Sequence, residues 1–388
     1  MTEHKLYCLP KFYIGLFGSM LFIGIAFQGF LLKLSDYYGR LMLIKVVTWI
    51  QVVLTLLMYT VQDYHYYYVL LFLIGISVSK TYCIFIYINE NSTQQYRMLV
   101  NCIGCMSDSS FTCIISSLFF ILGGKDWRHL AITAPISWTL WFVFSFFVYE
   151  SPKFLHAKGR YEELVAFINE SARQNGKEFK IEESLSFVSR WNTEKIDNYD
   201  TEIQQCKAEY SIWDDLKQTE ILINFTVIVW IYAFITYAYF LMGLYMKYAA
   251  GDIFFNTLIA SICELIAYLS SFVIVKLVGH KFSLTVLSSI SIIFGIPLIF
   301  DIPVKIASVC LICTRFWIQA TYPCMHYLSN SCLFNPLFVP FVYMISNIAA
   351  KVVTIFAPQI VELNKPIPVL SFLVASVGIL VWSRLFKV

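Results

Sequence analysis

Lys351, Glu264 and Arg315 each stand within a long apolar stretch of the sequence. A charged side chain costs roughly 2.5–3.5 kcal/mol at the centre of a membrane helix, so it normally faces a partner or water. The chemistry open to these residues is therefore the pairing and binding of ions. Lys80 and Asp108 stand in neighbouring apolar stretches, and their similar depth predicts that they pair. The alternative is that both stand near helix ends by chance.

The cysteines do not indicate catalysis. Cys102/Cys105 and Cys310/Cys313 have the C-x-x-C spacing of metal and redox sites, but such sites need accessible thiolates. Both pairs lie in apolar runs, so we interpret them as packing residues. The polar segment 150–218 contains no paired Cys/His ligands, no nucleophile–base motif and no glycine-rich phosphate loop. The sequence therefore predicts neither an enzyme nor a cofactor or metal site.

The composition is that of a membrane protein. Of the 388 residues 59% are hydrophobic and only 14% are charged, and the net charge is +3. Apolar runs of about 18 or more residues recur, each long enough to cross a hydrocarbon core. The runs are continuous and do not alternate, which indicates helices and not a β-barrel. The predicted partner is a lipid bilayer, and no basic stripe suggests nucleic acid.

We predict an all-α polytopic protein with about eleven transmembrane helices. The expected spans are 12–33, 41–61, 66–88, 98–122, 128–149, 219–242, 253–276, 282–300, 303–325, 334–357 and 366–386. They divide the chain into a five-helix bundle (1–149), a soluble helical linker (150–218) and a six-helix bundle (219–388). Lys and Arg are shared almost evenly between the two sets of loops, so charge does not fix the orientation.

The linker begins with two short helices. Ser151–Pro152 resembles a cap followed by proline at the first helical position, and Gly159 is expected to end that helix. A second helix should run from about Arg160 to a stop at Asn175–Gly176. Its apolar stripe has helical spacing and consists of Tyr161, Leu164, Val165 and Ile168.

Four stretches carry a family resemblance: "LSDYYGR" (34–40), "ENSTQQYR" (90–97), "DWRHLAI" (126–132) and "ESPKFLHAKGRYEELVAFINESARQNGK" (150–177). Together they resemble the major facilitator superfamily, and within it the organic cation/anion transporter group, solute carrier family 22. The resemblance implies two pseudo-symmetric bundles of six helices with a substrate site between them. Aligned on these motifs, the chain begins at the family's second helix and lacks the first.

The resemblance also implies gating residues in the first half. Asp36, Gly39 and Arg40 match a loop that holds the two bundles together by charge pairing. Glu90 and Arg97 match a Glu–Arg pair at the membrane face. A solvated loop pair worth under about 1 kcal/mol is the alternative interpretation of that match.

The second-half counterparts of these motifs are degraded. Gly279 and Lys281 are retained in the equivalent loop, but Lys276 stands where the family has Asp. The stretch "CLFNPLFV" (332–339) has neither the Glu nor the Arg of the family's second pair.

Lys351 precedes Ala357–Pro358 at the distance at which the family has a charged residue facing the cavity. The resemblance implies an anionic substrate when that residue is basic. The alternative is a lysine that snorkels to the end of its span. The family also has a Glu near the position of Glu264, which with Arg315 completes the candidate cavity residues.

Two functions follow. The first is a transporter-derived structural or accessory subunit of a larger membrane complex, impaired in transport, with protein partners at the face left by the missing helix. The alternative is an active secondary transporter of small organic ions, with anions favoured, that works by alternating access. The family's usual location is the plasma membrane, and a complex subunit would equally suit the mitochondrial inner membrane.

Overall fold

The fold was obtained as a computed structural model. The residues that it describes are 10–27, 34–35, 37–61, 63–78, 80–92, 96–121, 127–176, 217–248, 252–329, 334 and 338–385. Within these residues the regular elements are helices, and no strand occurs.

The α-helices described in the first half are α1 (Lys11–Ala26), α3 (Arg40–Thr60), α4 (Tyr64–Val78), α5 (Lys80–Asn91), α6 (Arg97–Ile121) and α7 (Trp127–Phe144). Those described in the second half are α13 (Thr219–Tyr245), α14 (Ile253–Val278), α15 (His280–Gly295), α16 (Val304–Ser329), α17 (Val339–Thr354), α18 (Ala357–Val361) and α19 (Ile367–Leu385).

These helices follow the eleven predicted spans in order. In the described part of the chain nine helical segments are long and apolar enough to cross a membrane, and two shorter apolar helices accompany them. The predicted span 66–88 corresponds to α4 and α5 together. The predicted span 334–357 is divided into α17 and α18 because Pro358 has no N–H to donate and its ring clashes with the carbonyl four residues earlier, where α17 ends.

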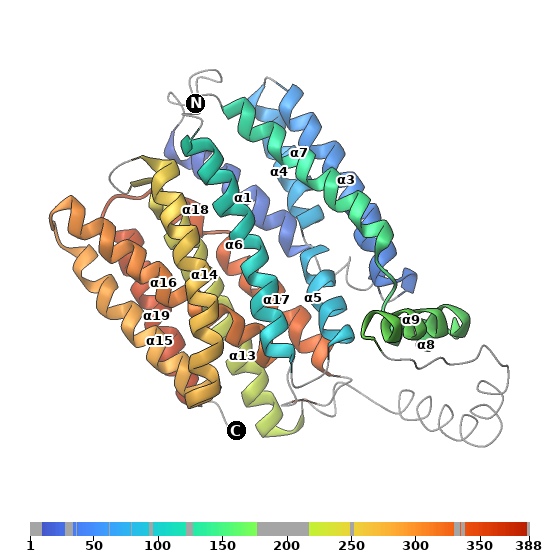
Figure 1. Ribbon diagram of the computed structural model, residues 1–388. Helices are drawn as coiled ribbons and strands as arrows, with labels where there is room; N and C mark the ends of the chain where they lie inside the picture. Colours follow the sequence, from blue (N-terminus) through green and yellow to red (C-terminus); the bar gives the residue numbers. More distant parts are fainter. Residues whose placement is uncertain are drawn as a thin grey trace.

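The linker's first helices agree with their predicted signals. α8 (Pro152–Ala157) has proline at its first turn, and Gly159 has a positive φ of 69° after it. α9 (Tyr161–Gln174) ends at Asn175, before Gly176 at φ 65°. These helices lie across one end of the bundle (Figure 1). The rest of the predicted linker, from 177 to 216, lies outside the described residues.

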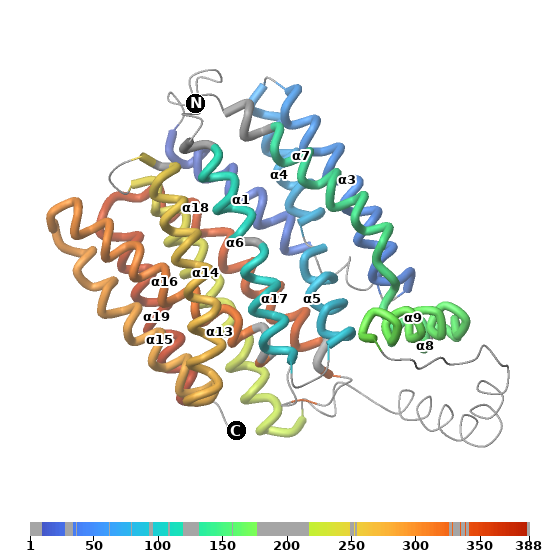
Figure 2. Tube along the Cα trace, in the orientation of Figure 1, coloured from blue at the N-terminus to red at the C-terminus, as the bar shows by residue number. Residues whose placement is uncertain are grey.

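The two halves meet along two sets of helix contacts. α6 of the first half packs against α14 of the second, and α1 packs against α17 and α18. Figure 2 shows both contacts on the Cα trace, with the chain coloured from end to end. Any site between the halves must therefore be enclosed by these contacts.

At the end of the molecule away from α8 and α9, the start of α1 is hydrogen-bonded to α18 and to the residues that follow it. Lys11 Nζ donates to Asn364 Oδ1 at 3.2 Å, and Gln359 Nε2 donates to the Phe12 carbonyl at 3.3 Å. Deeper along α1, Ser19 Oγ donates to the Ile355 carbonyl at 2.8 Å. The halves are thus joined by hydrogen bonds at this end.

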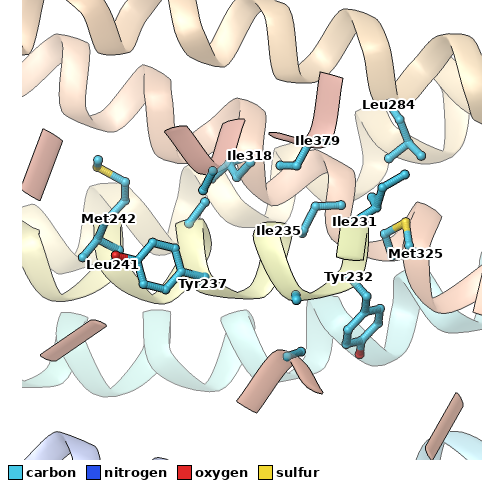
Figure 3. Packing of buried hydrophobic residues seen from close by; sticks show 14 of the residues in the cluster. Ile231, Tyr232, Ile235, Tyr237, Leu241, Met242, Leu284, Ile318, Met325 and Ile379 are labelled. Carbon is cyan, nitrogen blue, oxygen red and sulfur yellow. The ribbon is translucent and has the colours of Figure 1, made fainter. Parts of the chain in front are cut away.

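The largest hydrophobic core lies in the second half and is organised around α13. Its buried residues include Ile231, Ile235 and Leu241, each at most 1% exposed. Figure 3 shows them among side chains of the surrounding helices, including Leu284, Ile318, Met325 and Ile379. In the described residues of the first half the buried clusters are smaller.

The tightest helix contact in the first half is between α1 and α4. A Cβ on Gly24 would lie 2.1 Å from the Phe72 carbonyl oxygen, and one on Gly75 would lie 2.2 Å from the Leu21 carbonyl oxygen. The two glycines permit the backbones to approach this closely, as small residues do in membrane helix pairs.

We expect Gly24→Ala to lower the thermal midpoint of the detergent-purified protein, because the new methyl meets backbone that cannot move aside. Overpacking of this kind costs about 1–3 kcal/mol. Gly243→Ala on α13 is the matched control, since its Cβ would have neighbours no closer than 3.9 Å. Equal midpoints for the two variants would show that α1 and α4 are not in contact at Gly24.

Candidate functional site

Lys351 lies at the seam between the two halves. It is only 3% exposed, although it belongs to the last turn of α17. Its Nζ lies 4.4 Å from the ring centre of Phe240 on α13 and 6.0 Å from that of Phe22 on α1. Among the described residues no hydrogen bond or ion pair to a protein group satisfies it. Among the described residues the ammonium faces the two aromatic rings.

Further aromatic rings from both halves line the same seam. Tyr82 of α5 lies 6.2 Å, ring to ring, from Tyr343 of α17. On the second-half side, Tyr322 of α16 lies 5.7 Å from Tyr239 and 6.3 Å from Tyr232, both on α13. Such rings have negative faces that attract cations. Tyr82, Tyr232 and Tyr343 are buried, whereas Tyr239 and Tyr322 are partly buried, and buried hydroxyls need partners.

Glu264 and Arg315 form a buried ion pair between α14 and α16. Arg315 Nη2 donates to Glu264 Oε1, and the two side chains are 16% and 5% exposed for Arg315 and Glu264 respectively. The second carboxylate oxygen accepts a hydrogen bond from Ser109 Oγ of α6 at 2.8 Å. The pair therefore links α6 of the first half to two helices of the second.

Lys80 is a second buried lysine, but it points into the first half. Its Nζ donates to Gln51 Oε1 of α3 and lies 3.9 Å from the ring centre of Trp138 on α7. The predicted partner was Asp108, whose side chain lies outside what the structure describes. Gln51 and Trp138 supply the polar and aromatic contacts that a buried ammonium needs.

A polar network joins the ends of α3 and α5 to the start of α8. Arg40 Nη2 donates to Glu90 Oε1 at 2.9 Å, and Ser151 Oγ donates to Glu90 Oε2 at 2.6 Å. Glu150 accepts the backbone N–H of Leu41 at 3.0 Å. The first turn of α3 is thus held by two carboxylates, which favours its positive dipole end.

Gly39 allows this network to form. Its φ is 111°, a conformation that side chains rarely adopt, and a Cβ there would lie 2.6 Å from Glu150 Oε2. Arg40 also lies over the Phe154 ring at 5.7 Å. Asp36, the third residue of the predicted gating loop, lies outside the described residues.

The structure corrects two local predictions. Glu90 pairs with Arg40 and not with Arg97 among the described residues, because the end of α5 lies beside the first turn of α3. Ser151 occupies the cap position of α8, but its hydroxyl bonds Glu90 and no helix N–H. Arg97 is the first residue of α6.

The remaining candidates belong to the turn between α14 and α15. Gly279 has φ 80°, which explains why glycine stands there, and no atom lies within 4 Å of its would-be Cβ. Lys281 is exposed two residues later. Their gating role, like that of the first-half residues, stays a prediction.

Sequence reasoning missed the partners of the charged groups. Gln51, Ser109 and Trp138 all stand inside apolar spans. A polar residue at mid-span was the available signal for the first two, since such residues are rarely free in a membrane. No sequence signal indicated which helices they would join.

We expect Glu264→Gln to destabilise the protein strongly, because it leaves the Arg315 guanidinium buried without a counter-charge. Removing one partner of a buried pair costs about 3–5 kcal/mol. Ser109→Ala is the control: it keeps the pair and removes one hydrogen bond, worth about 0.5–1.5 kcal/mol. Thermal unfolding in detergent measures both, and the double variant Glu264→Gln/Arg315→Met should recover part of the loss. Equal thermal midpoints for Glu264→Gln and Ser109→Ala would show that the ion pair does not contribute to stability.

Residues 2–386 match the family described as "Sugar (and other) transporter". The chain is 23% identical over 370 residues to the human organic cation/carnitine transporter 2, covering 94% of this chain and 64% of that protein. It is 24% identical over 295 residues to mouse solute carrier family 22 member 21, covering 73% and 49% respectively. The chain thus spans about half to two thirds of the length of these curated relatives.

Solved structures agree on the fold. The partially occluded, inward-open xylose transporter XylE from E. coli superposes with a TM-score of 0.69 at 14% identity, covering 95% of this chain and 85% of that one. A second structure of the same transporter, in its inward-open conformation, gives 0.70 at 13% identity and covers 99% and 88%. The chain is an integral membrane protein that belongs to the sugar (and other) transporter family of the major facilitator superfamily, and it is similar to solute carrier family 22.

Proposed function

We propose that this chain is a secondary transporter of small organic ions that works by alternating access. One observation carries the proposal: a buried lysine, Lys351, stands at the seam between the halves without a protein counter-ion in the described residues. Burying an unpaired ammonium inside the membrane is unfavourable, so the group is expected to bind a ligand or water. An anionic group on the substrate would pair with the Lys351 ammonium.

The surroundings suit a substrate that also has a positive group. The rings of Tyr82, Tyr232, Tyr239, Tyr322 and Tyr343 lie around the same seam, and aromatic faces attract ammonium groups. Carnitine, after which the human relative is named, carries a carboxylate and a quaternary ammonium. We propose a small zwitterion or anion of this kind as the substrate class.

The closed end of the bundle supports a carrier. α1 is joined to α18 and α17 at one end by hydrogen bonds from Lys11, Ser19 and Gln359. These bonds have to break for access from that side, as alternating access requires. We propose the plasma membrane, the usual location of the resembling family, as the membrane.

Similarity to known transporters supports a carrier better than the predicted accessory subunit. The human and mouse relatives are transporters, and neither suggests a role in a membrane complex or in the mitochondrial inner membrane. The accessory role and its protein partners remain a second proposal.

We expect Lys351→Ala to weaken uptake of labelled carnitine into proteoliposomes. Loss of a charged hydrogen-bonding group costs about 1.5–3 kcal/mol, which is roughly a 10- to 100-fold rise in the half-saturating concentration. Lys351→Arg keeps the charge and should retain part of the uptake. Lys305→Ala removes an exposed lysine at the start of α16 and is the control.

Tetraethylammonium and benzoate, run in the same assay, separate the substrate classes. If the proposal holds, Lys351→Ala affects benzoate and carnitine more than tetraethylammonium. Wild-type uptake no higher than in protein-free liposomes, for all three compounds, would refute the carrier. Unchanged carnitine uptake by Lys351→Ala would refute the role of this lysine.

A further inference from the structure

Lys351 differs from the other buried charged residues in having no partner. Among the described residues, the buried acidic and basic side chains are Lys80, Glu264, Lys351 and Glu362. Lys80 donates a hydrogen bond to Gln51 Oε1. Glu264 pairs with Arg315, and Glu362 pairs with Lys247. The Lys351 ammonium forms no ion pair or hydrogen bond with the described residues.

The halves are in contact on both sides of Lys351 along α17. Four residues after it, the Ile355 carbonyl accepts a hydrogen bond from Ser19 Oγ of α1 at 2.8 Å. Eight residues before it, the Tyr343 ring lies 6.2 Å from the Tyr82 ring of α5. Both tyrosines belong to one apolar cluster built by the two halves, and Ile355 packs against it. Lys351 is therefore enclosed between the halves, with only 3% of its surface exposed.

The ionisable groups around this seam do not supply a counter-charge. Those that are neutral at ordinary pH are the hydroxyls of Tyr82, Tyr232, Tyr239, Tyr322 and Tyr343 and the thiol of Cys83. Arg315 on α16 and the two buried glutamates are engaged in the ion pairs given above. Lys11, at the start of α1, donates to Asn364. Among the described residues no negative charge therefore pairs with Lys351.

This position is unfavourable for an ammonium and acceptable for a neutral amine. Burial removes the water that solvates the charge, and the rings of Phe22 and Phe240 replace only part of that solvation. A buried lysine can release its proton, whereas an arginine stays protonated in proteins. The halves can therefore close around Lys351 without a net charge in two ways. The amine is neutral and no substrate is bound, or the ammonium is paired with an anionic group of the substrate.

We propose that Lys351 carries the coupling proton of this carrier, so that each anionic group bound at the seam crosses the membrane together with one proton. The proposal rests on the transport function proposed above and adds the coupling ion to it. The proton passes from water to the amine nitrogen on the side where the substrate binds. It returns from the same atom to water on the side where the substrate leaves. One N–H bond forms and later breaks, and no other covalent bond changes.

A proton gradient should therefore drive accumulation of the substrate. Acid on the side of binding favours the ammonium and with it the binding of the anionic group. A less acid opposite side favours release of the substrate together with the proton. For carnitine, the carboxylate pairs with Lys351 while the quaternary ammonium group stays charged and lies against the tyrosine rings. A difference of one pH unit can support accumulation of about tenfold when the membrane potential is zero.

The test uses the purified full chain in proteoliposomes, with potassium on both sides and valinomycin to keep the membrane potential at zero. With the outside one pH unit more acidic than the inside, labelled carnitine should accumulate up to about tenfold above its outside concentration. With equal pH on both sides, carnitine added outside should acidify the interior, which trapped pyranine reports. Carnitine does not cross the lipid by losing its charge, because its ammonium group is quaternary.

Lys351→Arg distinguishes proton coupling from substrate binding. An arginine can pair with the carboxylate but does not release its proton. This variant should therefore exchange labelled for unlabelled carnitine without accumulation in the pH gradient and without acidification. Lys351→Ala at saturating carnitine should also show uptake without acidification. Lys305→Arg, at an exposed lysine, is the control and should couple like the wild type.

Carnitine exchange by the wild type without accumulation in the pH gradient and without acidification would overturn this proposal and leave the transport function standing. Acidification by Lys351→Arg or Lys351→Ala equal to that of the wild type would overturn it as well, because another group would then carry the proton. A wild type that neither exchanges nor takes up carnitine would refute the transport function, and the coupling with it.

Discussion

A charged side chain inside a bilayer cannot be hydrated, so it needs a partner within the protein. This requirement determines how the interior of the protein is arranged. Arg315 forms an ion pair with Glu264, whose second carboxylate oxygen accepts a hydrogen bond from Ser109. Lys80 is met by Gln51 and by the face of Trp138. Each arrangement joins helices that are distant in sequence, so the same contacts that satisfy charge also fix which helices are neighbours.

Lys351 is the exception, and the function proposed for the chain follows from it. Its burial resembles that of Lys80, but no amide or carboxylate of the described residues reaches it. A residue that served only stability would be more favourable as leucine at this position, because desolvation of the ammonium is not repaid by a partner. The lysine is understandable if its partner arrives from solution as part of a substrate.

The helices could be predicted from sequence because crossing a membrane requires about 20 apolar residues, a signal that is local. The ends of α8 and α9 were equally local, being marked by Pro152, Gly159 and Asn175. The pairing of charged side chains, by contrast, is not determined by neighbouring residues in the sequence. Glu90 has Arg97 seven residues away along the chain, yet it pairs with Arg40, because contact depends on helix rotation and depth, which hydropathy does not encode.

The family's linker motif is conspicuous in the sequence for a reason that the structure makes physical. Ser151 and Glu150 hold the ends of α3 and α5, and Gly39 is a glycine because of Glu150. This network joins α3 and α5 of the first half to the start of the linker. Among the described residues the buried clusters of the first half are smaller than the continuous core that α13 supplies in the second half. In the described part of the chain the two halves therefore differ in what holds them: a continuous apolar core around α13 in the second half, and a polar network at the start of α3 in the first.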